Sequence, residues 1–377
     1  MNLISFNRPC LAGNEFAYMR LAVDGMRISG DGDFTKRAHS MLEGLVGARR
    51  ALLTTSCTHA LEMVAHLLDL APGDEVIVPS YTFVSTANAF ALRSAVPVFA
   101  DVRKDTLNLD EAAVEGLVSP RTRAIVAVHY AGIACEMETL LEIAARRGLT
   151  LVEDNAHGFL GAYRGRPLGS LGALATLSFH ETKNFTCGEG GALLLNDERF
   201  VARAEILREK GTDRGRFFRG EVDKYTWVDL GSSYLPSDLL AAFLVAQLEA
   251  RERIQARRRA IWEAYAEGLD AWALRTGARL PFVPPGCDPA WHLFFVVMPD
   301  EDARQRMLAH LADRGVNAVF HYVPLHLSPM GRRLGGRSGS CPVSEWASAR
   351  LLRLPLHLGL TDEDVARVVD AVTAYRA

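Results

Sequence analysis

The feature that most constrains the fold is the alternation of short apolar segments with helix-like segments between residues 50 and 200. Runs of four or five apolar residues rich in Val, Ile and Leu predict buried strands, and the segments between them predict helices. Strands that are apolar throughout are typical of a largely parallel sheet covered on both faces. The predicted strands are Ala51–Thr54, Glu75–Val78, Val96–Ala100, Ala124–Val128 and Leu149–Glu153, and the predicted helices are Thr58–Leu70, Val84–Leu92 and Met137–Arg147.

The pattern changes after residue 200. Two long helical segments are predicted at 197–211 and 238–269, followed by a mixed segment. In that segment we expect strands at 291–298 and 318–322 and helices at 303–314 and 362–375. The chain of 377 residues is long enough for two domains. We expect a large α/β domain over 1–250 and a smaller C-terminal α+β domain over 251–377, with the boundary inside the second long helix.

Composition excludes several classes of function. The formal net charge is −3 and the basic residues are dispersed, so we expect no nucleic-acid partner. The cluster Arg251–Arg259 lies beside Glu249 and Glu252 and is interpreted as a solvated helix face. No apolar stretch is long enough for a bilayer and the N-terminus shows no signal peptide, so no membrane association is expected. The six cysteines form no CxxC pair, which favours a reduced cytoplasmic protein without a metal site.

Ligands in open α/β sheets bind beyond the carboxyl ends of the strands, so the residues just after each predicted strand are the candidates for a site. Thr54–Thr58 opens a helix, where free N–H groups and the helix dipole favour a phosphate, although an ordinary cap by Ser56 or Thr58 explains the same residues. Asp154 ends an apolar strand and could pair with a protonated ring nitrogen, with His157 close to the same ring. The two acids of this strand could equally cap the next helix.

Two further segments complete the set. Lys183 follows a buried strand and precedes the glycine-rich Gly188–Ala192, a position that suits a Schiff-base amine because burial frees its lone pair. A surface lysine before a turn is the simpler alternative. Phe83 lies after another strand, where it could stack on a planar cofactor or pack in the core. Together a phosphate cradle, a pyridinium partner, a Schiff-base lysine and a ring stacker are the parts of a pyridoxal phosphate site.

These residues resemble the DegT/DnrJ/EryC1/StrS sugar aminotransferases over nearly the whole chain. The resemblance implies the type I, aspartate-aminotransferase-like fold, with a mostly parallel seven-stranded sheet in the large domain, and a homodimer with its active site at the subunit interface. The motifs that carry it are Ser-Cys-Thr-His-Ala-Leu from Ser56, Pro-Ser-Tyr-Thr-Phe-Val-Ser-Thr-Ala-Asn from Pro79, Val-Glu-Asp-Asn-Ala-His from Val152, Ser-Phe-His-Glu-Thr-Lys-Asn from Ser178, and Gly-Glu-Gly-Gly from Gly188.

The resemblance assigns roles to individual residues. Lys183 is expected to form the Schiff base with pyridoxal 5′-phosphate and to move protons, and Asp154 to pair with the pyridine nitrogen. His157 is expected to contact the ring or its phenolic oxygen, and Phe83 to stack on the ring face. The phosphate is expected to be held by Cys57, Thr58 and Ser178.

Within the family the chain is most similar to the dTDP-4-amino-4,6-dideoxygalactose transaminases of enterobacterial common antigen synthesis. The resemblance implies transfer of the amino group of L-glutamate to C4 of dTDP-4-keto-6-deoxyglucose. Candidate contacts to the sugar nucleotide are Arg219, Lys224, Tyr322 and His326. The motifs that carry the narrower match are Gly-Asp-Gly-Asp-Phe-Thr from Gly30, Val-His-Tyr-Ala-Gly from Val128, Arg-Glu-Lys-Gly-Thr from Arg208, Phe217–Trp227, Gly-Ser-Ser-Tyr-Leu from Gly231, and Phe320–His326.

Two positions depart from the common pattern of the family. Ser233 and Leu235 stand where many relatives carry an Asn and an Arg, and that Asn reaches the phosphate in the neighbouring subunit. Ser233 is therefore the candidate for the cross-subunit contact. His157 stands where close relatives often have Gln.

Other functions fit the sequence less well. Sugar dehydratases on this scaffold replace the lysine with His, and Lys183 argues against that chemistry. Amination at C3, or an equatorial amine at C4, is opposed only by the narrower resemblance. A non-catalytic protein that keeps the fold would not need an intact set of site residues. A nicotinamide oxidoreductase would need a complete glycine fingerprint, whereas Gly30-Asp-Gly32 lacks the third glycine and follows no strand.

Overall fold

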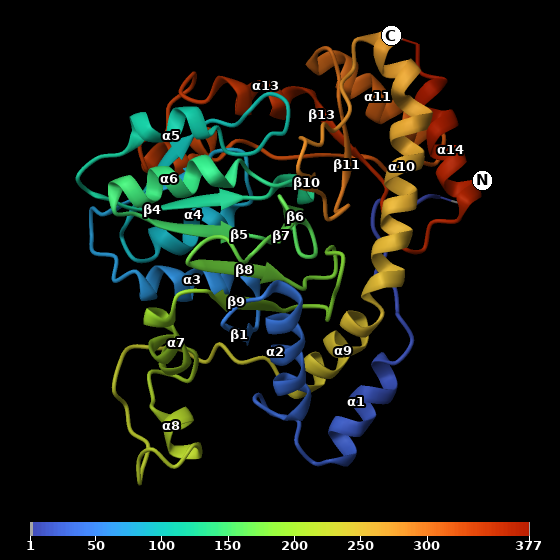
Figure 1. Ribbon diagram of the computed structural model, residues 1–377. Coiled ribbons are helices and arrows are strands. Elements are labelled where there is room, and N and C mark those ends of the chain that lie inside the picture. Colours follow the sequence, from blue (N-terminus) through green and yellow to red (C-terminus); the bar gives the residue numbers. More distant parts are fainter. Residues whose placement is uncertain (1–2, 377) are drawn as a thin grey trace.

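The computed structural model describes residues 3–376 and is built around a seven-stranded sheet (Figure 1). The strand order is β1-β9-β8-β5-β4-β2-β3, and β9 runs antiparallel to both of its neighbours while the other pairs are parallel. The mostly parallel α/β sheet expected from the sequence is thereby confirmed. Its strands are β1 (Arg50–Thr54), β2 (Glu75–Pro79), β3 (Val96–Ala100), β4 (Thr122–Val128), β5 (Thr150–Asp154), β8 (Leu174–Ser178) and β9 (Gly191–Leu195).

Helices cover both faces of this sheet because its central strands are apolar on both sides. In β4, Ala124, Val126 and Val128 pack in one core with α3 and α4, whereas Ile125 and Ala127 pack in a second core with α5 and α6. A third core joins the β1–β9–β8 end of the sheet to α2 and α9. The helices are α1 (Glu15–Asp24), α2 (Asp33–Val46), α3 (Cys57–Leu67), α4 (Val84–Ala91), α5 (Glu111–Leu117), α6 (Met137–Arg147), α7 (Val201–Arg208), α8 (Arg214–Phe218) and α9 (Asp238–Glu249).

The C-terminal part has its own core beside a small antiparallel sheet of order β11-β13-β12. In Figure 1 its long helix α10 stands at the edge of the large sheet with α11 and α14 against it. Ile4, near the N-terminus, pairs with Val316 and belongs to this core. The elements are α10 (Arg251–Thr276), β11 (Phe294–Val297), α11 (Glu301–Asp313), β12 (Val319–Phe320), α12 (Pro329–Arg333), α13 (Pro342–Arg350), β13 (Leu351–Leu354) and α14 (Asp362–Thr373).

One short sheet and three 3₁₀ turns complete the described part of the structure. A three-stranded sheet of order β10-β6-β7 lies beside the large sheet. Within residues 3–376 no helix is long and apolar enough to cross a bilayer. The remaining elements are β6 (Ala162–Tyr163), β7 (Arg166–Pro167), β10 (Cys287–Asp288), η1 (Tyr130–Gly132), η2 (Glu198–Phe200) and η3 (Leu325–Leu327).

The long helices differ from the prediction in their bounds. The segment predicted as one helix over 238–269 consists of α9 and α10, which are separated at Ala250 because its ψ of 7° leaves the helical region. α10 continues to Thr276, since Trp272 and Ala273 are buried, and it ends where Gly277 takes a φ of 72°. The segment predicted as a helix over 197–211 opens with the 3₁₀ turn η2, and α7 ends at Arg208. The domain boundary near residue 250 stays a prediction.

A buried carboxylate fixes the loop that follows β5. Glu153 accepts hydrogen bonds from Nε2 of His129 at 2.9 Å and from the N–H groups of Gly169, Leu171 and Gly172 at 2.7–2.8 Å. Burial raises the pKa of Glu153, and these donors more than offset that effect, so its pKa lies below the usual value. Because Glu153 immediately precedes Asp154, this network also holds the end of β5 in place.

Replacing Glu153 should therefore destabilise the whole protein. The Glu153→Gln variant keeps the side-chain volume but cannot accept from four donors, and we expect the free energy of unfolding to fall by about 3–5 kcal/mol. The measurement is urea denaturation followed by circular dichroism. Glu142→Gln is the control, because Glu142 pairs with Arg146 at 3.9 Å and its side chain is 72% exposed. Its loss should be under about 0.5 kcal/mol, and equal losses in the two variants would contradict this account.

Candidate active site

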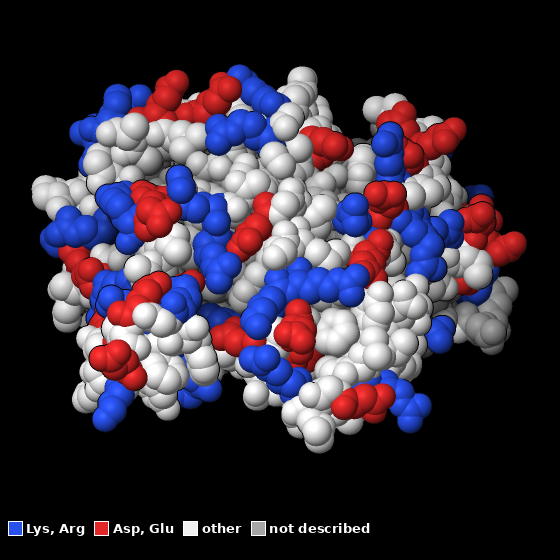
Figure 2. All heavy atoms as spheres, turned by 60° about the horizontal axis from the view of Figure 1, so that its bottom comes forward, with Lys and Arg blue, Asp and Glu red and all other residues white. Residues whose placement is uncertain are grey.

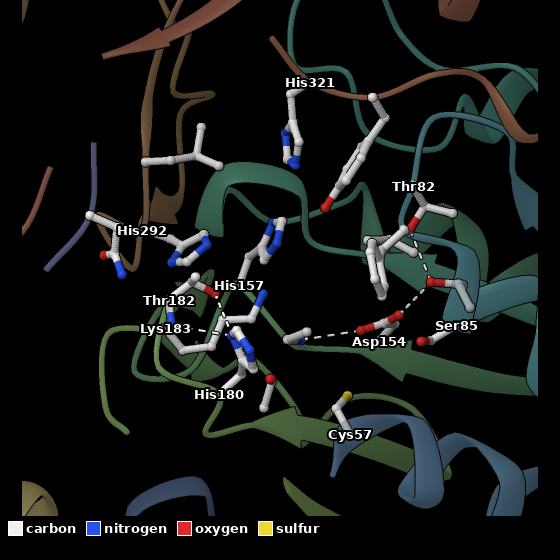
Figure 3. Close-up of a pocket in the computed structure, with 18 of the residues that line it drawn as sticks. Cys57, Thr82, Ser85, Asp154, His157, His180, Thr182, Lys183, His292 and His321 are labelled. Atoms are coloured by element: carbon white, nitrogen blue, oxygen red, sulfur yellow. Dashed lines mark hydrogen bonds between the residues drawn. The ribbon is translucent and has the colours of Figure 1, made fainter. Parts of the chain in front are cut away.

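One cavity of about 810 Å³ lies at the carboxyl ends of the parallel strands, between the large sheet and the small antiparallel sheet. Figure 3 shows His292, His157 and Lys183 on one side of it, and Asp154, Thr82 and Ser85 on the other. Eight of the residues predicted from the sequence line this cavity. They are Cys57, Thr58, Phe83, Asp154, His157, Ser178, Lys183 and Tyr322.

The start of α3, where the sequence predicts a phosphate site, lies at the wall of the cavity. Ser56 caps the helix by accepting from the N–H of His59, so the N–H groups of Cys57 and Thr58 have no helical carbonyl to bond. The hydroxyl of Thr58 lies 2.7 Å from that of Ser85 in the first turn of α4, which brings a second helix start to the same place. The cap by Ser56 is thus confirmed, and the phosphate site stays a prediction, with which the two amides that follow the cap are compatible.

The thiol of Cys57 is a neutral part of this cradle. Its Sγ lies 3.5 Å from Oγ1 of Thr176, and burial raises its pKa to about 12. A thiol with this pKa stays protonated at neutral pH and adds no negative charge beside a bound phosphate.

Asp154 presents a carboxylate at the end of β5. Its Oδ2 accepts from the hydroxyl of Thr86 at 2.7 Å, and its Oδ1 accepts from the N–H of Ala156 at 3.3 Å. Burial raises the pKa of Asp154, and these two donors partly offset that effect. The partner that the sequence predicts for Asp154 is a cationic ring nitrogen. Such a cation beside Asp154 would offset the free-energy penalty of burying its negative charge.

Lys183 reaches the same cavity from the turn after β8. Its N–H donates to the carbonyl of His180 at 2.9 Å, which fixes the backbone of the turn. Burial lowers the pKa of Lys183 to about 8, although Cys57 and Asp154 act in the opposite direction. The unprotonated amine is therefore far more abundant near neutral pH than in an exposed lysine, which favours a nucleophilic role.

Three histidines form a column beside Lys183. The rings of His157 and His292 are stacked with centroids 4.3 Å apart, and the ring of His321 lies 6.3 Å from that of His157. Burial lowers the pKa of all three well below the usual value, so the column is neutral. Nδ1 of His157 is buried and has no hydrogen-bond partner among the described residues, which leaves it available to a bound group.

The hydrogen bonds around Asn184 determine the tautomer of His292. Nδ2 of Asn184 donates to the carbonyl of Ala290 at 2.6 Å, so Oδ1 of Asn184 must be an acceptor. Nδ1 of His292 lies 2.9 Å from this oxygen and therefore carries the proton. Nε2 of His292 is left as a hydrogen-bond acceptor.

Phe83 and Tyr322 close another side of the cavity. Phe83 is the N-terminal cap residue of α4 and its side chain is 57% exposed, so it is not a core residue. Its ring centroid lies 6.4 Å from that of Tyr322. The position is open enough for a planar ring to stack against Phe83.

Four predicted residues do not line the cavity. Ser233 forms a single bridge with Glu209, Arg219 forms ion pairs with Glu205 and Glu221, and Lys224 is exposed. His326 is fully buried, with Nδ1 beside the hydroxyl of Ser80 and Nε2 at 3.0 Å from Oε1 of Glu345. Both nitrogens of His326 are thus occupied within the subunit.

Sequence reasoning missed several residues of the site. Thr86, which donates to Asp154, lies inside a motif that supports the family resemblance, and its place in the first turn of α4 was the available signal. Two of these residues belong to the region of the small sheet, namely Arg353 in β13 and His292 just before β11. Two others, Phe6 and Asn7, belong to the N-terminal segment. No local pattern distinguishes these four, because only the tertiary fold brings them to the strand ends.

The comparisons with known proteins agree with this geometry. The model of the DegT/DnrJ/EryC1/StrS aminotransferase family matches residues 9–373. The aminotransferase TlmJ from Streptoalloteichus hindustanus is 33% identical, with a TM-score of 0.91 over 99% of this chain and 98% of that one. DesV from S. venezuelae is 31% identical, with a TM-score of 0.89 over the same shares. The sugar aminotransferase Spr1654 from Streptococcus pneumoniae in its PLP form, at 24% identity, a TM-score of 0.91 and 98% of both chains, shows the same fold.

The family match covers nearly the whole chain, and TlmJ and DesV, both above 30% identity, align with it over 98–99% of each chain. Pyridoxal phosphate fits the groups that line the cavity, which are the amides at the start of α3, the carboxylate of Asp154, the unpartnered Nδ1 of His157 and the amine of Lys183. The chain therefore belongs to the DegT/DnrJ/EryC1/StrS aminotransferase family and is a pyridoxal-phosphate-dependent aminotransferase.

Proposed function

We propose that this enzyme transfers the amino group of L-glutamate to C4 of a nucleotide-linked 4-keto-6-deoxy sugar. The preferred acceptor is dTDP-4-keto-6-deoxyglucose, which would give dTDP-4-amino-4,6-dideoxygalactose for polysaccharides such as enterobacterial common antigen. The observation that carries the proposal is the cavity in which the amine of Lys183 and the carboxylate of Asp154 lie together. The sugar and its stereochemistry rest on the narrower sequence resemblance.

Several residues of the cavity have distinct tasks in this proposal. When bound, pyridoxal phosphate supplies an electron sink and carries the amino group between the two substrates. Lys183 holds the cofactor through its amine and afterwards moves a proton to and from the reacting carbon. Asp154 keeps the ring nitrogen protonated by a charge-assisted hydrogen bond, and Thr86 orients its carboxylate. The amides of Cys57 and Thr58, with the hydroxyl of Ser178, hold the phosphate.

The small sheet limits access of water to the reacting atoms. Tyr322 and His321 lie on the segment that follows β12, and the hydroxyl of Tyr130 lies 2.9 Å from Nδ1 of His321. Tyr81 donates to the carbonyl of His321. These contacts fix a wall of neutral aromatic rings over the site, so that the charges of Lys183 and Asp154 act in a medium of low dielectric constant.

The enzyme should complete both halves of the reaction with these substrates. Addition of L-glutamate to the protein loaded with pyridoxal phosphate should bleach the visible band of the lysine-bound cofactor, and dTDP-4-keto-6-deoxyglucose should restore it. Absorbance spectroscopy follows both steps, and NMR of the product identifies the aminated carbon and its configuration.

Two variants make this experiment specific. Lys183→Ala should form no lysine-bound band and lose turnover, whereas the exposed Lys36→Ala should behave as the natural protein. Bleaching without recovery would retain the aminotransferase and reject the sugar. Undiminished turnover in Lys183→Ala would overturn the role of that lysine.

Capture of the cofactor should depend on pH through Lys183. Only the unprotonated amine attacks, and burial lowers its pKa to about 8. The rate at which the visible band appears should therefore rise with pH and level off above pH about 8, as measured by stopped-flow mixing of cofactor-free protein with pyridoxal phosphate. N-acetyl-lysine run in parallel corrects for titration of the cofactor itself. A corrected rate that keeps rising toward pH 10 would contradict a lowered pKa.

We also propose that the enzyme acts as a homodimer, with the open side of the cavity near the subunit interface. α1 packs on α9 yet leaves three large apolar side chains exposed, and Met26 in the following turn is 92% exposed. Patches of this kind commonly mark interfaces. The exposed residues of α1 are Phe16, Leu21 and Val23. In a dimer, we expect Ser233, Lys224 and Arg219 to serve the partner's cavity, where Arg219 would exchange its ion pairs with Glu205 and Glu221 for substrate.

Light scattering after size-exclusion chromatography should give twice the mass of the chain. The double variant Phe16→Asp with Leu21→Asp should shift the protein toward the monomer, because each charge would be buried in the interface. Leu274→Asp is the matched control, since Leu274 is 79% exposed on α10. A monomeric natural protein, or dissociation in the control alone, would refute the interface on α1.

The proposed location is the cytoplasm. All six cysteines are free in the structure, and several of them, such as Cys135 and Cys341, are buried. Free thiols persist in the reducing cytosol.

A further inference from the structure

A buried arginine beside the active site, Arg258 in α10, is directed at the backbone of a neighbouring segment. It is 4% exposed, and no carboxylate among residues 3–376 forms an ion pair with it. Its Nε donates to the carbonyl of Trp291 at 3.0 Å, and its Nη2 donates to the carbonyl of His292. A buried charge is costly without partners, and here the partners are carbonyl groups of one short segment.

That segment contains a residue in a disfavoured backbone conformation. Trp291 has a φ of 53°, in the left-handed region, where the Cβ of a bulky residue crowds the backbone. Its indole packs edge-on against Trp262 of α10, with ring centroids 5.0 Å apart, and does not line the cavity. His292, the next residue, does line it. The left-handed turn at Trp291 thus separates a side chain that packs on α10 from one that enters the active site.

Side chains hold all three carbonyls of residues 290–292. The carbonyl of Ala290 accepts from Nδ2 of Asn184 at 2.6 Å and from Nε2 of Gln255 at 3.3 Å. The other two carbonyls accept from Arg258, which lies one helical turn after Gln255 on α10. A strained conformation persists only where the surrounding structure determines it. The two hydrogen bonds from Arg258 are therefore the direct restraint on the strained residue and the one after it.

The segment places the ring of His292 on the ring of His157. The two rings are stacked with centroids 4.3 Å apart and an interplanar angle of 28°. Nδ1 of His292 donates to Oδ1 of Asn184 at 2.9 Å, and Asn184 directly follows Lys183 in the chain. Figure 3 shows both histidines beside Lys183. A shift of the 291–292 backbone would therefore be felt at His157, whose Nδ1 is left for a bound group.

We propose that Arg258 is a positioning residue of the active site. By holding Trp291 in its left-handed conformation, it keeps the ring of His292 stacked on that of His157. Arg258 touches neither cofactor nor substrate and acts through the backbone of residues 291–292. The inference rests on the proposed function, because its effect on rate presumes that L-glutamate reacts at this cavity and that His157 contacts the cofactor.

The first experiment compares variants of Arg258 in the half-reaction with L-glutamate. Arg258→Met removes both donors, and Arg258→Lys keeps the charge and a donor. Arg257→Met is the matched control, because this neighbouring arginine of α10 binds Asp362 and the carbonyl of Leu360, which do not line the cavity. Single-turnover bleaching of the lysine-bound band gives the maximum rate, the half-saturating concentration of L-glutamate and the amplitude.

Arg258→Met should lower the maximum rate by about 10- to 100-fold, because a misplacement of about 1 Å that originates away from the reacting atoms can cost that much. The half-saturating concentration should stay within about twofold, since Arg258 does not touch the donor. Arg258→Lys should fall between the natural enzyme and Arg258→Met, and Arg257→Met should stay within about twofold of the natural enzyme. A residue needed only for folding would reduce the amplitude and leave the rate of the folded molecules unchanged.

A double-mutant cycle with Trp291→Gly tests the backbone step. Glycine takes a positive φ without the steric penalty, so the segment should depend less on Arg258. The loss caused by Arg258→Met should therefore be smaller by about threefold or more in the Trp291→Gly background than in the natural one. Loss of the indole packing occurs in both arms of the cycle and cancels. If Arg258→Met does not fold, Arg258→Gln, whose side chain is too short to reach both carbonyls, takes its place in the cycle.

The second readout needs no cofactor. In cofactor-free protein with isotope-labelled histidine rings, nitrogen NMR distinguishes the neutral tautomers, because protonated and unprotonated ring nitrogens have different chemical shifts. The signals of His292 are assigned by their loss in His292→Gln. They should show the proton on Nδ1 in the natural protein and in Arg257→Met. In Arg258→Met this signature should give way to shifts averaged over the two tautomers.

Other results would overturn the inference. An undiminished rate in Arg258→Met would mean that the segment keeps its conformation without this arginine. An equal loss in both backgrounds of the cycle, or an unchanged tautomer of His292 in Arg258→Met, would make Arg258 a residue of the general fold. If L-glutamate does not bleach the band of the natural enzyme, the proposed function fails, while the tautomer of His292 still decides whether Arg258 holds its ring in place.

Discussion

Two adjacent carboxylates at the end of β5 are the constraint on which the site depends. Because side chains alternate along a strand, Glu153 and Asp154 leave the sheet on opposite sides. Glu153 accepts four hydrogen bonds, three of them from backbone N–H groups of the 169–172 segment. Asp154 faces the cavity and accepts a hydrogen bond from the hydroxyl of Thr86. One acid therefore fixes the position of the other. This arrangement lets a carboxylate remain buried at the site without a permanent cation beside it.

Few charged groups lie in the cavity, and they determine its electrostatics. Lys183, Asp154 and Arg353 are the charged groups nearest the reaction, and a neutral column of His157, His292 and His321 fills the space among them. Each charge lowers or raises the pKa of its neighbours because little water separates them. The outer surface differs, since Figure 2 shows acidic and basic side chains interspersed over one face. Ion pairs such as those of Arg203 with Asp69 and Asp229 balance charge away from the cavity.

The sequence predicted those parts of the fold and the site that local chemistry determines. The bounds of β3 and α6 agree with the prediction to the residue, because apolar strands and amphipathic helices carry their own periodicity. Asp154 and Lys183 could be predicted from the sequence, because residues that follow parallel strands must meet at one edge of the sheet. Arg353 and His292 were not, since their approach depends on how the C-terminal part packs on the large sheet. His326 illustrates the opposite case, in which a polar residue in a family motif is occupied inside the subunit.

The path of the N-terminal segment has a mechanical consequence. Ile4 is paired with Val316 in the C-terminal core, and Phe6, two residues later, stacks under the guanidinium of Arg353. Both ends of the chain are thus anchored in one block, with the helix break at Ala250 on the route back to the large sheet. If that block rotates about the break when substrates exchange, Phe6 and Arg353 on this side of the cavity move together. The aromatic ring and the cation would keep their mutual geometry through every turnover, and only their distance from Asp154 would change.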